Sequence, residues 1–80
     1  MKRYKRNWVN AGIAYRKDVY MVIKPDQDNP NWLVRRVHGA AGQQDNEIEG
    51  TFTSERKAFK FANKAVWRAK WNRFINNATD

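Results

Sequence analysis

The sequence predicts a single α+β domain in which a three-stranded antiparallel sheet packs against one long C-terminal helix, in the order β-β-β-α. Residues 13–24 and 32–38 are rich in β-branched and aromatic residues, which is typical of strands. Residues 47–52 alternate between apolar and polar side chains, as a strand with one buried face does. From Ala58 to Ile75, apolar residues recur with the period of an amphipathic helix.

A basic N-terminal arm is predicted in residues 1–12, so that the folded domain spans residues 13–80. Four cations surround Tyr4 in this arm, and Trp8 follows them. These cations are Lys2, Arg3, Lys5 and Arg6. Gly12 closes a short stretch that is typical of a break in the chain, and we place the end of the arm there.

Turn-forming residues separate the predicted strands. Residues 25–31 hold two prolines among Asp and Asn, which makes them the clearest loop in the chain. In the strand 32–38, alternation places Arg35 on one face and Arg36 on the other, and periodicity does not choose the buried face. In the strand 47–52, one face is expected to carry Ile48, Gly50 and Phe52, and the other face Glu47, Glu49 and Thr51.

Thr53 or Ser54 is expected to cap the helix, which would span about 22 residues and roughly 33 Å. One arc of this helix is rich in alanine. Because small side chains let a helix lie close to a sheet, we assign this arc to the core. The arc contains Ala58, Phe61, Ala62, Ala65 and Ala69, with Val66 at its edge.

Three large aromatic residues, Trp67, Trp71 and Phe74, form one stripe on the opposite side of the helix. A helix packed by its alanine arc leaves this aromatic stripe in water, and an exposed apolar stripe usually has a partner. Four explanations are open. The N-terminal arm folds back over it through Trp8 or Tyr4, or a second copy of the chain packs on it as a homodimer. Alternatively, it binds a protein or nucleic-acid bases, or it belongs to a second small core.

A third arc of the helix is cationic. Its members follow spacings of three and four residues and are Lys57, Lys60, Lys64 and Arg68. Seven cations against Glu55 alone give residues 54–77 a net charge of +6. Like charges at these spacings cost about 0.2–0.5 kcal/mol each. Both a solvated face and an anion-binding face are compatible with this basic ridge.

The composition narrows the class of function. The 80 residues carry 16 Lys and Arg against 8 Asp and Glu, and the net charge of +8 favours an anionic partner such as nucleic acid, an anionic membrane or an acidic protein face. The absence of cysteine excludes disulfides and thiolate metal sites. No apolar run is long enough to span a membrane, and no secretory signal is recognisable, so we expect a cytoplasmic protein.

Catalytic chemistry finds little support in the sequence. The one histidine, His38, has no cysteine to pair with, and the one serine, Ser54, is best used as a helix cap. The carboxylates group either in a turn, at Asp26 and Asp28, or on the expected solvent side of a strand. We therefore expect no enzyme, no cofactor and no metal site.

Binding of nucleic acid, and of DNA in particular, is the first hypothesis, because Lys and Arg neutralise phosphates and supply sequence-independent affinity. The expected contacts are the basic ridge and the N-terminal arm. Arg16, Arg35 and Arg36 on the strands are further candidates, since a β-ribbon fits the major groove.

Three short patterns stand out along the chain: the strand Trp32-Leu33-Val34-Arg35-Arg36-Val37, the helix entry Phe52-Thr53-Ser54, and the helix face with Ala58, Ala62 and Ala65. Together they resemble small DNA-binding modules with three strands and one helix, of the integrase arm-binding and plant transcription-factor type. They also resemble small uncharacterised phage and bacterial proteins of the same plan. The first resemblance implies a sheet that faces the major groove, with Arg16, Arg35 and Arg36 as contacts. Glu47 and Glu49 would repel phosphate on that face, which favours the basic ridge and the arm.

A protein-binding module is the second hypothesis. A short, basic, aromatic-rich chain without cysteine looks like an accessory protein of a phage or mobile element that binds and modulates a host protein. Trp67, Trp71 and Phe74 would then be the anchors, because aromatic residues dominate interface energies. The basic ridge would steer them toward an acidic surface. Association of the helix with a membrane surface is a minor third reading, since alanines give shallow insertion.

Overall fold

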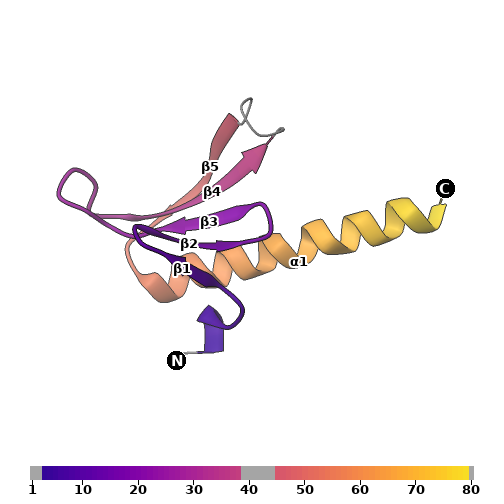
Figure 1. Ribbon diagram of the computed structural model, residues 1–80, viewed down its shortest axis with the longest axis horizontal. Coiled ribbons are helices and arrows are strands. Elements are labelled where there is room, and N and C mark those ends of the chain that lie inside the picture. The colour runs from indigo at the N-terminus through magenta and orange to yellow at the C-terminus, as the bar shows by residue number, and fades with distance from the viewer. Residues whose placement is uncertain (1–2, 39–44, 80) are drawn as a thin grey trace.

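The computed structural model describes residues 3–38 and 45–79, and it shows a sheet with one long helix across one face (Figure 1). The elements are a 3-10 helix η1 (Arg3–Lys5), β1 (Val9–Ala11), β2 (Ala14–Lys17), β3 (Tyr20–Ile23), β4 (Trp32–His38), β5 (Asp45–Phe52) and α1 (Glu55–Thr79). Neighbouring strands are antiparallel, and their order in the sheet follows the chain. The α+β class, the antiparallel sheet and the long C-terminal helix are confirmed. The predicted number of strands is wrong, because the sheet has five strands rather than three.

Two tight turns account for the additional strands. Between β1 and β2 the loop consists of Gly12 and Ile13, and Gly12 has a φ of 76°. Between β2 and β3 the loop consists of Asp18 and Val19, and Asp18 has a φ of 57°. Glycine adopts positive φ without strain, and Asp tolerates it better than most residues do. The segment predicted as one strand over residues 13–24 is therefore a hairpin.

The N-terminal residues are part of this fold. β1 is an edge strand of the sheet, and Trp8 immediately before it is buried in the core. The 3-10 helix η1 packs against α1. The predicted boundary between arm and domain, at residues 12 and 13, falls inside the turn that joins β1 to β2.

The core lies between α1 and one face of the sheet, and it is centred on Phe59. This side chain is fully buried. Four aromatic rings surround it at centroid distances of 5.2 to 6.5 Å, and they are Tyr4, Trp8, Tyr15 and Trp32. Tilted and edge-to-face ring pairs of this kind stabilise a fold beyond the apolar area that they bury.

The buried side of α1 contains a different phenylalanine from the predicted alanine-rich arc. Ala58 and Ala62 are fully buried and Val66 nearly so, as predicted. Phe61, however, is 37% exposed, and Phe59 takes the central place. The predicted arc is displaced because the N-terminal residues pack on the Phe59 side of the helix and extend the core in that direction.

A β-bulge in β5 changes which of its side chains face the helix. Val34 pairs with Gly50, but the next residue, Arg35, pairs with Ile48, so Glu49 is an extra residue in β5. The alternation shifts at this point. Ile48 lies on the outer face, where it is 54% exposed. The prediction that Ile48 and Gly50 share a face is wrong for this reason.

Beyond the bulge, β4 and β5 rise away from α1 toward their far ends (Figure 1). Glu47 stands opposite Arg36 in the pairing, and residues directly opposite one another share a face. Arg36 faces α1, because it lines a hollow together with residues of that helix. Glu47 is therefore on the helix side of the sheet rather than on the predicted outer face.

The helix α1 extends beyond the sheet (Figure 1). Its 25 residues span about 37 Å, whereas the four residues of β3 span about 13 Å. An ion pair between Arg73 and Asp18, with 2.6 Å between Nη2 and Oδ2, ties the projecting part to the β2–β3 turn. Residues 70–75 are exposed all round the helix. Within residues 3–38 and 45–79, no helix combines the length and apolar content that crossing a bilayer requires.

Candidate nucleic-acid interface

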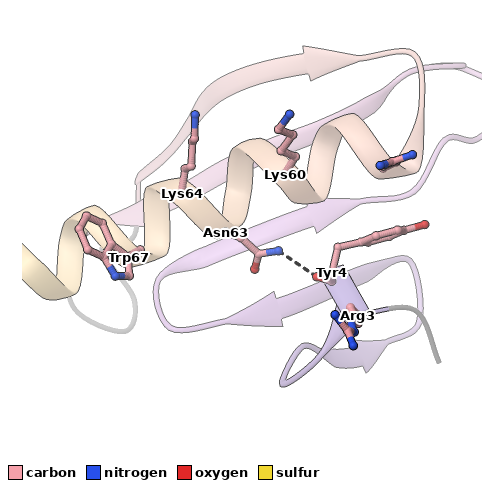
Figure 2. A pocket seen from close by; sticks show the side chains of 7 residues that line it. Arg3, Tyr4, Lys60, Asn63, Lys64 and Trp67 are labelled. Atoms are coloured by element: carbon pink, nitrogen blue, oxygen red, sulfur yellow. Dashed lines mark hydrogen bonds between the residues drawn. The ribbon is translucent and has the colours of Figure 1, made fainter.

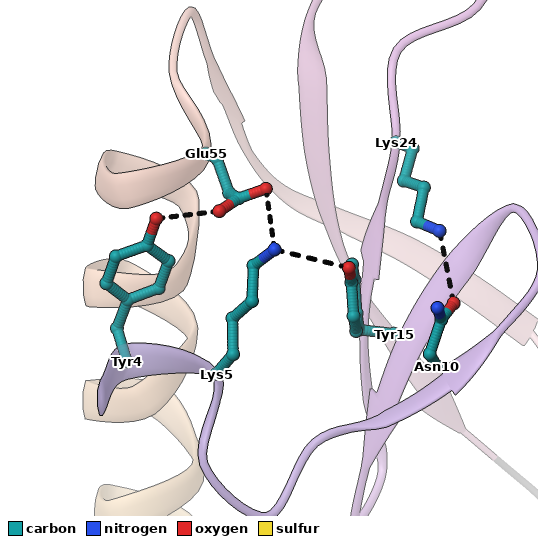
Figure 3. Close-up of polar contacts among 6 residues, drawn as sticks. All are labelled: Tyr4, Lys5, Asn10, Tyr15, Lys24 and Glu55. Carbon is teal, nitrogen blue, oxygen red and sulfur yellow. Dashed lines mark hydrogen bonds and ion pairs between the residues drawn. The ribbon is translucent and has the colours of Figure 1, made fainter. Parts of the chain in front are cut away.

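The N-terminal turn is fastened to the first turn of α1 through Glu55 (Figure 3). The Tyr4 hydroxyl donates a hydrogen bond of 2.6 Å to Glu55 Oε1, and Lys5 Nζ lies 3.0 Å from Glu55 Oε2. Lys5 also donates to the Tyr15 hydroxyl on β2, at 3.3 Å. The charge of Lys5 is therefore used inside the protein, although the sequence suggested it as a contact for nucleic acid.

Asn63 provides a second attachment, two turns further along α1. Its Oδ1 accepts a hydrogen bond of 2.8 Å from Trp8 Nε1, and its Nδ2 donates one of 2.9 Å to the backbone carbonyl of Tyr4. One amide side chain thus satisfies a nearly buried indole N–H and a backbone carbonyl at the same time. This pair of bonds holds the residues from Tyr4 to Trp8 along one side of α1.

The Lys5–Glu55 pair gives a prediction for alkaline pH. The hydrogen bond to Glu55 raises the pKa of the Lys5 ammonium above its ordinary value, and desolvation lowers it by less. The pKa of Lys5 is therefore higher in the folded state than in the unfolded state. The stability that the Lys5–Glu55 pair contributes is fully present below about pH 10.4, the unfolded pKa, and is lost as pH rises through the folded pKa. We expect Lys5→Met to lower the free energy of unfolding by about 0.5–1 kcal/mol at neutral pH. Urea unfolding at about pH 8 and about pH 11.5 checks this prediction. The difference in free energy of unfolding between Lys5→Met and wild type must be smaller at the higher pH.

A cationic hollow lies between η1 and α1, with a volume of about 490 Å³. It is lined by Arg3, Tyr4, Arg56, Lys60, Asn63, Lys64 and Trp67. Lys60 and Lys64 extend from successive turns of α1 on one side, Trp67 lies one turn further on, and Arg3 and Tyr4 come from η1 (Figure 2). Four of the seven lining residues are cations and none is a carboxylate.

The structure divides the predicted basic ridge. Lys60 and Lys64 line the cationic hollow, whereas Lys57 is exposed outside it. Arg68 lines a different hollow on the opposite side of α1. That second hollow also contains Asp18 and Glu49, so its cations face carboxylates.

The arginines of the sheet are also divided. Arg16 and Arg35 lie in one row on the outer face, with Met21 between them. Arg36 is on the other face and lines the second hollow with Arg68. The three sheet contacts that the DNA-binding modules imply are therefore not on one surface. In the N-terminal arm, Arg6 is exposed outside the cationic hollow, and Lys2 lies outside the described residues.

The aromatic stripe is exposed, as the sequence predicts. Trp67, Trp71 and Phe74 are 64%, 50% and 63% exposed. Tyr4 and Trp8 pack on Phe59 instead of covering it, so cover by these arm residues and burial in a second core are both wrong.

The rings of the stripe are stacked on one another along α1. The Trp67 and Trp71 centroids are 5.9 Å apart with an interplanar angle of 2°, and those of Trp71 and Phe74 are 5.7 Å apart at 26°. Trp67 is also a wall of the cationic hollow. Planar rings and cations that form no ion pair among the described residues therefore adjoin one another along α1.

Sequence reasoning missed Arg56, Tyr4 and Asn63 as members of this surface. A signal for Arg56 was present, because residues 56, 60, 64 and 67 follow spacings of four and three and so share one side of the helix. The predicted ridge started from Lys57 instead and passed through Arg68. For Tyr4 and Asn63 the sequence carries no such signal, since their roles depend on the N-terminal turn folding back onto α1.

Comparisons with protein-family models, with curated proteins and with solved structures found no match to this chain. In the part of the chain that the structure describes, no group of three or more His, Cys, Asp or Glu residues is placed to hold a metal ion.

Proposed function

We propose that this protein binds nucleic acid in the cationic hollow between η1 and α1. The observation that carries the proposal is the composition of the hollow, which is lined by four cations from two separate segments and by no carboxylate. Arg3 comes from the N-terminal turn, and Arg56, Lys60 and Lys64 come from α1. Residues from both basic segments of the sequence therefore line one candidate site.

The charges of the hollow are available to a ligand. Within the described residues, none of its four cations forms an ion pair, whereas Lys5 and Arg73 do. Holding like charges close together is unfavourable unless an anion neutralises them. A phosphate backbone supplies such anions at regular spacing, and its binding releases counterions. The acidic residues Asp18 and Glu49 lie around the second hollow and do not oppose a ligand here.

Reversal of two charges tests the proposal. We expect Lys60→Glu/Lys64→Glu to weaken binding to DNA or RNA oligonucleotides by on the order of 100-fold at about 50 mM salt, and to reduce the slope of log affinity against log salt by about 2. Fluorescence anisotropy over a salt series measures both quantities. The matched control is Lys57→Glu/Arg68→Glu, which changes the net charge equally on exposed positions of the same helix outside the cationic hollow.

Two outcomes would contradict the proposal. Wild-type protein that binds neither DNA nor RNA at low salt would remove nucleic acid as the ligand. Equal losses in the two double variants would show that affinity follows the net charge rather than the cationic hollow, because both remove the same number of cations.

A protein target is the second candidate, and the exposure of Trp67 and Trp71 favours it. In this reading the chain is an accessory protein, of the phage or mobile-element kind, whose aromatic stripe docks on an acidic host protein. Capture from a lysate treated with nuclease separates the two candidates. A specific protein band that survives nuclease and disappears with Trp67→Ala/Trp71→Ala would support this second candidate against the first.

A further inference from the structure

The aromatic stripe begins where the cationic hollow ends. Trp67 is a wall of the hollow and also the first ring of the stack that continues through Trp71 to Phe74. These rings occupy successive turns of α1, as Lys60 and Lys64 do before them. A ligand that follows the helix therefore meets cations over one stretch of about 10 Å and flat rings over the next.

The charges around the rings indicate an anionic occupant. Lys70 lies between Trp67 and Trp71 along the chain, and Lys64 lies one turn before Trp67. A second copy of this chain would bring the same cations against each other, which is unfavourable at an interface. An anionic partner with planar groups satisfies both the cations and the ring faces.

Flat, exposed aromatic rings favour a single strand over a duplex as the ligand. In a duplex, base faces are stacked on one another and only groove edges and phosphates are accessible to a protein. An unpaired base offers its face, and stacking of bases on aromatic side chains is how many proteins hold single strands. The stripe lies on the side of α1 opposite the buried Ala58 and Ala62, and its three rings are 50% to 64% exposed in the part of the chain that the structure describes.

We infer that the preferred ligand is single-stranded nucleic acid, with phosphates in the cationic hollow and unpaired bases against the exposed ring surface of the aromatic stripe. This inference rests on the proposed function and adds the class of nucleic acid. Phosphate contacts supply affinity for any strand, and the ring stack supplies the preference for unpaired bases.

The test compares Trp67→Ala/Trp71→Ala with wild type on an oligothymidine of about 15 nucleotides and on a duplex of the same length. We expect affinity for the single strand to fall on the order of 100-fold in the double variant, while affinity for the duplex changes less than about threefold. Trp67→Phe/Trp71→Phe keeps flat rings and must retain most of the single-strand affinity. Ile75→Ala, another exposed apolar residue of the same helix, is the matched control.

A second measurement reports the contact directly. Bases that stack on Trp67 and Trp71 quench their fluorescence, whereas Trp8 is buried in the core and Trp32 is half-buried against it. Quenching by oligothymidine in the wild type must therefore disappear in Trp67→Ala/Trp71→Ala. Thermal unfolding of the variants verifies that they fold, which we expect because both rings are at least half exposed.

Failure of the inference is distinguishable from failure of the proposed function. Equal binding of single strand and duplex, unaffected by Trp67→Ala/Trp71→Ala, would overturn the inference and leave the cationic hollow as a general phosphate site. Absence of binding to either oligonucleotide would overturn both. Concentration-dependent dimerisation that the double variant abolishes would overturn the inference in favour of a second copy on the aromatic stripe.

Discussion

Phe59→Ala is expected to lower the free energy of unfolding by about 3–5 kcal/mol, which is comparable to the whole stability of a domain of this size. Phe59 is fully buried, and the rings of Tyr4, Trp8, Tyr15 and Trp32 surround it. Removal of the ring leaves a cavity that these large neighbours fill only in part. Urea unfolding followed by circular dichroism measures the loss, and Phe59→Leu provides a milder variant if the alanine variant does not fold.

The matched control is Phe61→Ala, the same substitution two residues along α1. Phe61 is 37% exposed, and its one ring neighbour within the described contacts is Phe52, at 5.2 Å. We expect it to cost about 1 kcal/mol. A larger loss from Phe61→Ala than from Phe59→Ala would place the core on the alanine arc that the sequence alone suggests and would contradict the structure described above.

Asn63→Leu is expected to lower the free energy of unfolding by about 2–3 kcal/mol. The substitution keeps the size of the side chain but removes the acceptor for Trp8 Nε1 and the donor to the Tyr4 carbonyl. A nearly buried donor without a partner costs about 1–3 kcal/mol. Urea unfolding gives the loss, and a shift of Trp8 fluorescence to longer wavelength would report that the N-terminal turn has left α1.

Asn72→Leu is the control for the Asn63→Leu prediction. Asn72 is exposed on the same helix, and it takes no part in the two hydrogen bonds that Asn63 forms. A double-mutant cycle with Trp8→Phe isolates the bond to the indole, since phenylalanine keeps a ring but has no N–H. If Asn63→Leu costs no more in the wild-type background than in the Trp8→Phe background, the bond to Trp8 does not stabilise the fold.

Much of the helix could be predicted from the sequence. Ala58, Ala62 and Val66 are buried and Trp67 and Trp71 are exposed, as the period of the helix requires. These positions depend on a local repeat of 3.6 residues, which the sequence contains in full. The antiparallel order of neighbouring strands was predictable for a similar reason, because short connections between strands favour hairpins.

Errors arose where a single residue changes the register of the backbone. The turn at Asp18 and Val19 divides residues 13–24, whose β-branched and aromatic residues predicted one strand, into β2 and β3. The bulge at Glu49 moves Ile48 to the outer face although residues 47–52 alternate regularly. A shift of one residue reverses every following side chain in a strand, and composition does not reveal where it occurs.

The sequence by itself determined which segments carry charge and which side of α1 carries the aromatic stripe, because both follow from composition and helical period. Only the tertiary structure decided which cations act together. Tyr4 meets Glu55 across 51 residues and Asn63 across 59 residues, so Arg3 lines the same hollow as Lys60 and Lys64, and Lys5 pairs with Glu55. Contacts over such separations depend on how the whole meander packs on the helix, and that packing is set by the core around Phe59 rather than by the charged residues themselves.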